Sequence, residues 1–192
     1  MKRHDKLADT LPVGTLGILA LESSHDMGKR VNDYIVDWRK DRAAQNATAS
    51  TFAGYNRDSF LIDSACPRFG SGEAKGIINE SVRGDDLYLL VDVCNYSLTY
   101  TVCGHTNHMS PDDHYQDLKR IIAAVGGKAR RITVIMPFLY ESRQHRRSAR
   151  ESLDCAMALH ELTQMGVESS ISFDAHDPRV PRACPLISFD SG

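Results

Sequence analysis

The sequence lacks several features that mark particular classes of protein. No apolar run approaches the ~20 residues that a membrane-spanning helix needs. The first 12 residues, MKRHDKLADTLP, lack the apolar stretch of a secretory signal. Neither sign of charge dominates, because 23 Lys and Arg stand against 25 Asp and Glu, whereas nucleic-acid binders usually carry a strongly basic domain. These absences predict a cytoplasmic protein with neither membrane nor nucleic acid as a partner.

The cysteines do not form a recognisable disulfide framework. There are five of them, an odd number, at the scattered positions 66, 94, 103, 155 and 184. Without an export signal, reduced thiols are the expected state. The remaining composition, 42% hydrophobic and 25% charged over 192 residues, is typical of a soluble globular chain with one domain.

Segments typical of strands alternate with segments of helical spacing. The strand-like segments are 17–21, 60–62, 74–78, 87–93, 132–136 and 167–173, and the helical ones lie within 27–38, 111–125 and 153–165. This alternation predicts βαβ units and a mostly parallel sheet.

Polar residues mark where the helices are expected to begin and end. Ser23, Ser24 and Asp26 are candidate caps for the first helix, and Ser110 with Asp113 resembles a capping box for the second. Residues 1–13 are interpreted as a lead-in and 14–192 as the domain. The apolar run at 186–192 has no following helix to cover it, which we interpret as a hint of truncation.

Two polar clusters follow predicted strands, where open parallel sheets bind ligands. Asp174 and His176 come directly after 171–173 and suit either a divalent cation or a plain turn before Pro178. The segment 141–151, ESRQHRRSARE, holds four arginines in eight residues. It suits a polyphosphate cradle or a solvated basic turn.

Two further patterns are weaker. The segment 69–73, FGSGE, superficially resembles a dinucleotide loop, but a strand is predicted after it and a hairpin turn explains it as well. Cys103, His105, His108 and His114 have spacing like that of zinc ligands. A structural zinc site is disfavoured there because no second pair of ligands completes a tetrahedron.

Taken together, four segments resemble the N-terminal half of ribose-phosphate diphosphokinase (phosphoribosyl pyrophosphate synthetase). They are RFGSGEAKGIINESVRGDDLYLLVD (68–92), PDDHYQDL (111–118), RITVIMPFLYESRQHRR (131–147) and ISFDAHDPRV (171–180). Their order matches the family's FxDGE…ESVRGxD, NDHLMEL, VIPYxxYARQDRK and MDLHAPQ segments. The resemblance implies a phosphoribosyltransferase-like three-layer α/β/α fold.

The resemblance also implies a reaction and a set of site residues. The family transfers diphosphate from ATP, with Mg²⁺, to ribose 5-phosphate, which yields 5-phosphoribosyl 1-diphosphate and AMP, and it assembles as homo-hexamers. ATP contacts are implied for Phe69, Ser71, Glu73, Arg143, Gln144 and Arg146. In the family, the segment that carries Phe69 and Glu73 serves the site of a neighbouring subunit. His176 is implied as the Mg²⁺ ligand, and Ser81 and Arg83 as contacts for regulatory phosphate.

The sequence departs from the family pattern in two substitutions, in an insert and in its extent. Ser71 stands where the family usually has Asp or Asn, and His145 replaces the Asp of RQDR. The segment Thr101–His108 is an insert relative to short members. Most importantly, the family's ribose-phosphate loop and its catalytic-lysine loop belong to a C-terminal half that these 192 residues do not contain. We therefore expect the chain by itself to be inactive. The alternative is a non-catalytic domain that binds nucleotide or phosphate or regulates a synthetase.

Overall fold

A parallel sheet lies at the centre of the computed structural model, which describes residues 11–45, 48–144, 149–173 and 186–188. The strands are β1 (Leu16–Ala20), β4 (Asp86–Leu90), β7 (Arg131–Ile135), β8 (Ser169–Ser172) and β9 (Leu186–Ser188). They lie side by side in this order, and each pairs in parallel with the next. The predicted parallel sheet is confirmed, and residues 186–188 supply one of its strands.

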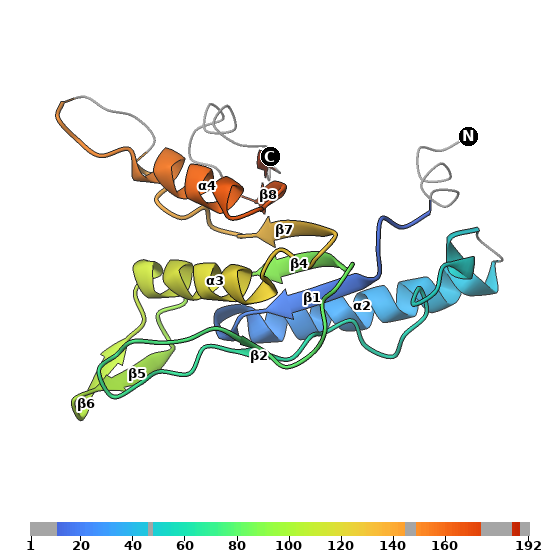
Figure 1. The fold of residues 1–192 in the computed structure, drawn as a ribbon, viewed down its shortest axis with the longest axis horizontal. Coiled ribbons are helices and arrows are strands. Elements are labelled where there is room, and N and C mark those ends of the chain that lie inside the picture. The colour runs from blue at the N-terminus through green and yellow to red at the C-terminus, as the bar shows by residue number, and fades with distance from the viewer. Residues whose placement is uncertain (1–10, 46–47, 145–148, 174–185, 189–192) are drawn as a thin grey trace.

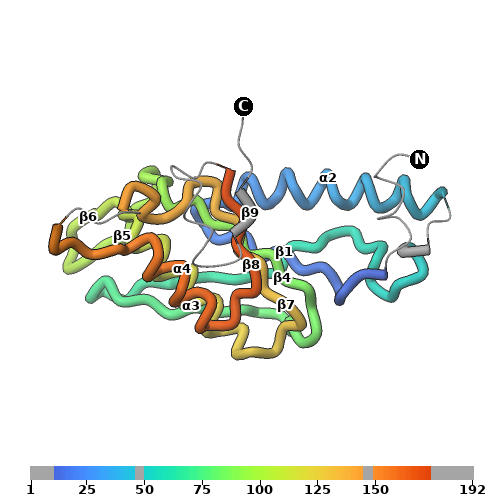
Figure 2. The backbone as a smooth tube through the Cα atoms, turned by 90° about the horizontal axis from the view of Figure 1, so that it is seen from above, coloured from blue at the N-terminus to red at the C-terminus, as the bar shows by residue number. Residues whose placement is uncertain are grey.

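Helices cover both faces of this sheet. α2 (His25–Ala44) packs against one face, whereas α3 (Pro111–Val125) and α4 (Asp154–Gln164) pack against the other. Figure 1 and Figure 2 show the strands between these two helical layers. The three-layer α/β/α architecture is therefore confirmed. No helix in the described part of the chain is long and apolar enough to cross a membrane.

The core divides into two clusters because successive side chains of a strand point to opposite faces. On β4, Leu87 and Leu89 join the large cluster under α3 and α4, while Leu90 and the half-buried Tyr88 face α2. α2 approaches β1 closely at Gly28. A Cβ built there would lie 2.3 Å from the Cβ of Ala20, so a side chain cannot fit without moving the helix.

The helix termini confirm one predicted cap and correct another. The Oγ of Ser110 accepts a hydrogen bond from the Asp113 N–H, the Asp113 carboxylate accepts in return from the Ser110 N–H, and the left-handed Gly126 ends α3. Ser24 occupies the N-cap position of α2, but its side chain makes no capping hydrogen bond. The Ser23 side chain does not cap the helix, because its Oγ accepts from the Asp92 N–H in the loop after β4.

The segments 60–62 and 74–78 are much less regular than predicted. Around 60–62 the chain makes a single parallel bridge, from Leu61 to Ile18 beside β1. The second segment contributes β3 (Ile77–Ile78), which pairs antiparallel with β2 (Ser64–Ala65), and a single antiparallel bridge from Ala74 to Arg68. Both segments lie outside the five-stranded sheet.

The insert forms an antiparallel hairpin of β5 (Thr99–Val102) and β6 (His105–His108). Its two-residue turn, Cys103-Gly104, has positive φ at both positions (48° and 83°). That geometry suits the right-handed twist of paired strands. The hairpin projects from the body beside the loop that precedes β3 (Figure 1).

Candidate functional site

The loops that follow β1, β4 and β7 meet at the carboxyl edge of the sheet. The Ser23 Oγ and carbonyl bind the Asp92 N–H and the Asn95 side chain, at 3.1 and 3.0 Å, and so tie the first two loops together. In open parallel sheets this edge is where ligands bind. The predicted site is therefore expected at this edge.

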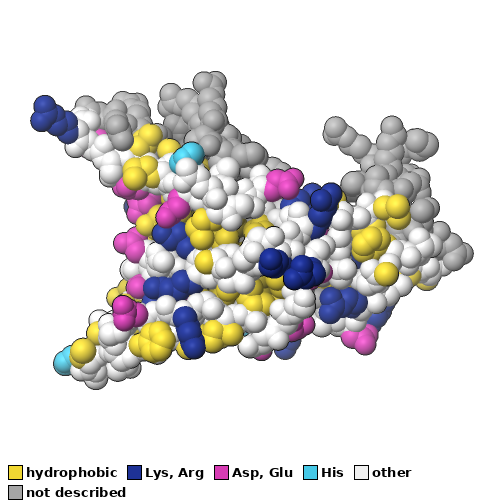
Figure 3. Space-filling model, in the orientation of Figure 1, with side chains coloured by type: hydrophobic (Ala, Val, Ile, Leu, Met, Phe, Trp, Pro, Cys, Tyr) yellow, Lys and Arg dark blue, Asp and Glu magenta, His cyan; other side chains and the backbone are white. Residues whose placement is uncertain are grey.

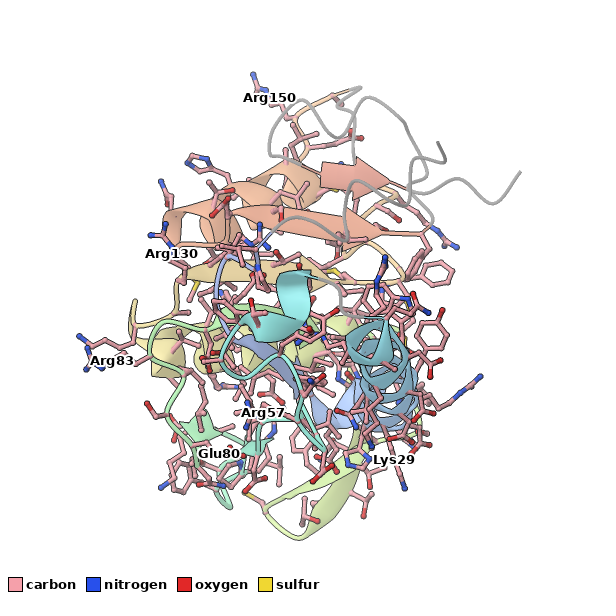
Figure 4. The ribbon with its side chains drawn as sticks, turned by 90° about the vertical axis from the view of Figure 1, so that its right-hand side faces the viewer. Lys29, Arg57, Glu80, Arg83, Arg130 and Arg150 are labelled. Atoms are coloured by element: carbon pink, nitrogen blue, oxygen red, sulfur yellow. The ribbon has the colours of Figure 1, made fainter. Side chains whose placement is uncertain are left out.

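The described residues of the arginine-rich segment, 141–144 and 149–151, are not helical, and α4 begins only at Asp154. The Gln144 Nε2 donates to the Ser152 carbonyl at 2.8 Å, and this bond braces the base of the loop. Arg143 is exposed, as is Arg150 (Figure 4). Arg146 lies outside the described residues.

Arg143 lies in a mixed electrostatic environment. Burial and Asp92 raise the pKa of the Cys94 thiol while Arg143 opposes them, which places the Arg143 guanidinium close to the loop after β4. Burial, followed by Asp154 and Asp112, raises the pKa of Glu141. Glu141, Asp154 and Asp112 therefore form a group of neighbouring carboxylates in and around the loop that carries Arg143.

The segment 69–73 forms a tight turn, as the hairpin interpretation predicted. The Phe69 N–H donates to the Glu73 carbonyl at 2.7 Å, and the Gly72 N–H donates to the Phe69 carbonyl at 2.9 Å. The Ser71 Oγ donates to Glu73 Oε2 at 3.0 Å. The Phe69 ring is 52% exposed, so the turn presents an aromatic face and a carboxylate to solvent.

This turn is held by residues from distant parts of the chain. The Arg68 guanidinium pairs with the buried Asp117 of α3 at 2.8 Å and stacks 4.7 Å above the Tyr100 ring of β5. The Cys103 N–H donates to the Gly70 carbonyl at 3.1 Å. Gly72 has a φ of +90°, and a Cβ there would lie 2.9 Å from Val102, so glycine is required where the hairpin packs.

The described parts of the predicted ATP site form two separate groups. Phe69, Ser71 and Glu73 lie beside the β5–β6 hairpin, whereas Arg143 and Gln144 lie in the loop before α4. Figure 1 shows these two loops at the same end of the molecule, on opposite sides of α3. Within one chain the structure does not bring the two groups together, so a shared site would need a second chain.

Ser81 and Arg83 lie at the opposite edge of the sheet. Both are exposed in the loop that precedes β4, where the Gly84 N–H donates to the Lys128 carbonyl just ahead of β7. Arg83 points away from the body (Figure 4). In one chain, the predicted regulatory phosphate site is therefore remote from the predicted ATP residues.

The residues with zinc-like spacing have other roles. His108 stacks on Tyr96 with 4.3 Å between ring centroids, and the buried His114 bonds to the Asn95 carbonyl at 2.7 Å. Among the described residues, no group of three or more His, Cys, Asp or Glu side chains could hold a metal ion. His176 lies outside the described residues.

Sequence reasoning missed the hairpin and the pairing of Arg68 with Asp117. The hairpin had a local signal, since the alternating residues of TYTV and HTNH flank a two-residue turn that contains glycine. The ion pair had none, because 49 residues separate its partners.

Comparisons with known proteins agree with these features. Residues 16–166 match the family model described as the N-terminal domain of ribose phosphate pyrophosphokinase. Ribose-phosphate pyrophosphokinase 1 of Schizosaccharomyces pombe is 32% identical over 116 residues, which are 59% of this chain and 25% of that protein. Ribose-phosphate pyrophosphokinase of Vibrio parahaemolyticus is 30% identical over 123 residues, which are 62% of this chain and 35% of that protein.

A solved structure has the same fold. The crystal structure of phosphoribosylpyrophosphate synthetase from Mycobacterium smegmatis superposes with a TM-score of 0.66 at 19% identity, over 91% of this chain and 48% of that one. The chain thus spans about half of that structure and a quarter to about a third of the curated relatives. Because the family model covers most of the sequence, the chain belongs to the ribose-phosphate pyrophosphokinase family and corresponds to its N-terminal domain.

Proposed function

We propose that the chain is the ATP-side domain of a ribose-phosphate diphosphokinase, which transfers diphosphate from ATP to the 1-hydroxyl of ribose 5-phosphate and releases AMP. The observation that carries this proposal is the family match over residues 16–166, which includes both loops assigned to ATP. The named activity is that of the relatives, and we propose it for this chain because the chain belongs to the same family.

Arg143 is the residue best placed to bind phosphate. It is exposed at the carboxyl edge of β7, and the bond from Gln144 to Ser152 braces its loop. A planar guanidinium can hold two phosphate oxygens at once. Arg143 would bind the triphosphate.

Phe69 and Glu73 would serve the ATP site of a second copy of the chain. Phe69 is half exposed on a turn that Arg68 and the hairpin hold in place. An exposed ring on a fixed turn is suited to stack on a flat base that a neighbouring subunit binds. The proposal therefore includes a homo-oligomer in which each site draws residues from two chains.

We propose that Mg²⁺ is bound as a complex with ATP. The described residues do not form a metal cage of their own. Mg²⁺ is usually held by substrate phosphates, water and one or two protein ligands, and His176 is the ligand that the family resemblance implies. When bound, the ion would neutralise negative charge on the phosphates.

Substitution of Arg143 tests the proposal. Arg143→Ala should weaken the binding of Mg-ATP by about 1.5–3 kcal/mol, the range for a hydrogen bond to a charged group. Calorimetry on the purified chain measures this. Arg150→Ala is the matched control, since it removes the same exposed charge from the same loop. Unchanged affinity in Arg143→Ala, or an equal loss in both variants, would contradict the assignment.

A further inference from the structure

A pocket of about 330 Å³ lies beyond the carboxyl end of β1, apart from both loops assigned to ATP. Its lining comes from the β1–α2 connection, the β2 segment, α3 and the two ends of the β5–β6 hairpin. Neither Arg143 nor Phe69 lines it. Its volume is at the lower end of the ~300–1,000 Å³ range of small-molecule sites.

Bonds between its walls hold the pocket open. The His114 Nε2 bonds to the Asn95 carbonyl at 2.7 Å, and the Met109 N–H donates to the Leu98 carbonyl at 2.9 Å. Also on α3, Asp117 is held in place, since the Cys66 thiol donates to its carbonyl and two arginines pair with its carboxylate. Protein interiors contain few voids larger than a water molecule, so a pocket framed by fixed bonds indicates a site that is already formed.

Polar groups that can each make a further hydrogen bond line the pocket. The His114 ring is 2% exposed, and its Nε2 must donate to Asn95 because a carbonyl only accepts. In the neutral ring Nδ1 is then an acceptor, and it has no hydrogen bond among the described residues. The Ser23 Oγ accepts from the Asp92 N–H and keeps its own proton to donate. The Ser64 hydroxyl also has no partner within the described ranges.

The remaining lining restricts the charge of a ligand. Leu21, Leu98 and Met109 give the pocket a mainly apolar surface, and neither Lys nor Arg lines it. The lining carboxylates are Asp117, which is already paired, and Glu22, which lies exposed near His25. Phosphates and carboxylates would lose their water there without gaining a cationic partner. A neutral molecule that can both donate and accept hydrogen bonds is favoured.

We propose that this pocket binds a neutral nitrogen heterocycle of nucleobase to nucleoside size. An N–H of the ring would donate to His114 Nδ1, a ring nitrogen or carbonyl would accept from the Ser23 hydroxyl, and the flat ring would pack between the apolar walls. This site is distinct from the proposed ATP site and does not depend on it. The pocket shares Glu22, Cys66 and Pro67 with the cleft under Arg68 and Phe69, so its occupant touches the segment that leads into the 69–73 turn.

Direct binding of adenine, adenosine and AMP to the purified chain, measured by calorimetry at neutral pH, tests this site. Adenine and adenosine are expected to bind at one site per chain, and AMP at least tenfold more weakly than adenosine. His114→Gln should weaken adenosine binding at least tenfold, because the glutamine amide can still donate to Asn95 but does not replace Nδ1. Leu98→Trp, which fills the pocket, should abolish it. Circular dichroism verifies that each variant is folded.

The controls separate this site from the proposed ATP site. Lys29→Ala, on the exposed side of α2 and outside the pocket, should leave adenosine binding unchanged. If Phe69→Ala, which removes the ring proposed to stack on the base of ATP, abolishes adenosine binding while Leu98→Trp leaves it intact, the ligand occupies the proposed ATP site and the pocket proposal is wrong. AMP that binds as tightly as adenosine, or no binding of any of the three compounds, also overturns it. Adenosine binding that survives Phe69→Ala but is lost in Leu98→Trp supports the pocket whatever the fate of the ATP proposal.

Discussion

Two buried serines on one strand of this domain differ in whether their hydroxyl groups are hydrogen-bonded. Ser170 and Ser172 lie on the same face of β8 and are 1% and 0% exposed. The Ser172 Oγ donates to the Pro137 carbonyl at 3.3 Å, whereas the Ser170 Oγ has no partner among the described residues. A buried hydroxyl without a partner loses its hydrogen bonds to water and gains none in the protein, so it destabilises the folded state.

Ser170→Ala is therefore expected to raise the free energy of unfolding by about 1 kcal/mol, since it removes an unsatisfied group and leaves almost no cavity. Ser172→Ala, the matched control two residues away, should lower it by a similar amount. Urea denaturation of both variants measures the difference. A loss of stability in Ser170→Ala would show that its hydroxyl has a partner, such as a water molecule.

Glu141 gives a pH-dependent prediction. Burial, Asp154 and Asp112 raise its pKa in the folded state above the ordinary value of 4.5. Between these two pKa values the folded state binds more protons than the unfolded state, so the contribution of Glu141 to stability falls as pH rises through this window. Glu141→Gln, which cannot ionise, should have a higher Tm than the wild type at pH 7. The advantage should disappear near pH 4. A constant difference in Tm at both pH values would contradict the assigned cause.

At the scale of elements, the β5–β6 hairpin supports the turn at 69–73. Arg68 connects three elements, because it pairs with α3, stacks on β5 and donates to the Gly72 carbonyl at 3.4 Å. The bond from Cys103 to Gly70 joins the hairpin directly to the turn. The hairpin therefore acts as a brace for residues that are proposed to contact nucleotide.

Loss of Arg68 should loosen this brace. Arg68→Ala is expected to speed hydrogen exchange of the Cys103 and Gly72 amides at least tenfold, since opening of the turn would cost less. Arg120→Ala is the control, because it also removes a partner of Asp117 but is not involved in the contacts with Tyr100 or Gly72. Hydrogen exchange followed by NMR or mass spectrometry distinguishes the two variants. Equal acceleration in both would mean that Asp117 alone orders the turn.

At the scale of the whole molecule, the surface charge, the separation of the two groups assigned to ATP and the share of the relatives' length that the chain matches bear on its activity. Lys and Arg are interspersed with Asp and Glu on the face in Figure 3, in keeping with the net charge of −2. The two groups assigned to ATP lie on opposite sides of α3. Complete activity is therefore proposed to need both a second copy and the part of the relatives that this chain does not match.

We expect the purified 192-residue chain to form no AMP from ATP and ribose 5-phosphate. The residues that would position the attacking hydroxyl are not among those assigned here, and positioning supplies up to ~7–11 kcal/mol of a barrier. Chromatography of nucleotide products over time measures this. Turnover within the ~1–100 s⁻¹ of kinases would show that the chain holds every essential group.

Local chemistry in the sequence determined the elements whose signals are short-range. The capping box, the proline at the first turn and Gly126 set the bounds of α3, and continuous apolar segments identified β1, β4 and β7. Hydrogen bonds and steric preferences between neighbouring residues decide such features, so they can be read along the chain. The family motifs likewise indicated which loops would carry function.

Only the tertiary structure decided how these parts meet. It paired Arg68 with Asp117 across 49 residues and packed the hairpin against the 69–73 turn. It also directed the Ser23 side chain, a predicted helix cap, to a hydrogen bond with the loop after β4. It also placed the two groups proposed to bind ATP apart and formed the pocket beyond β1. Contacts between distant segments depend on how the sheet orders its strands and which faces its helices cover. No local pattern encodes them.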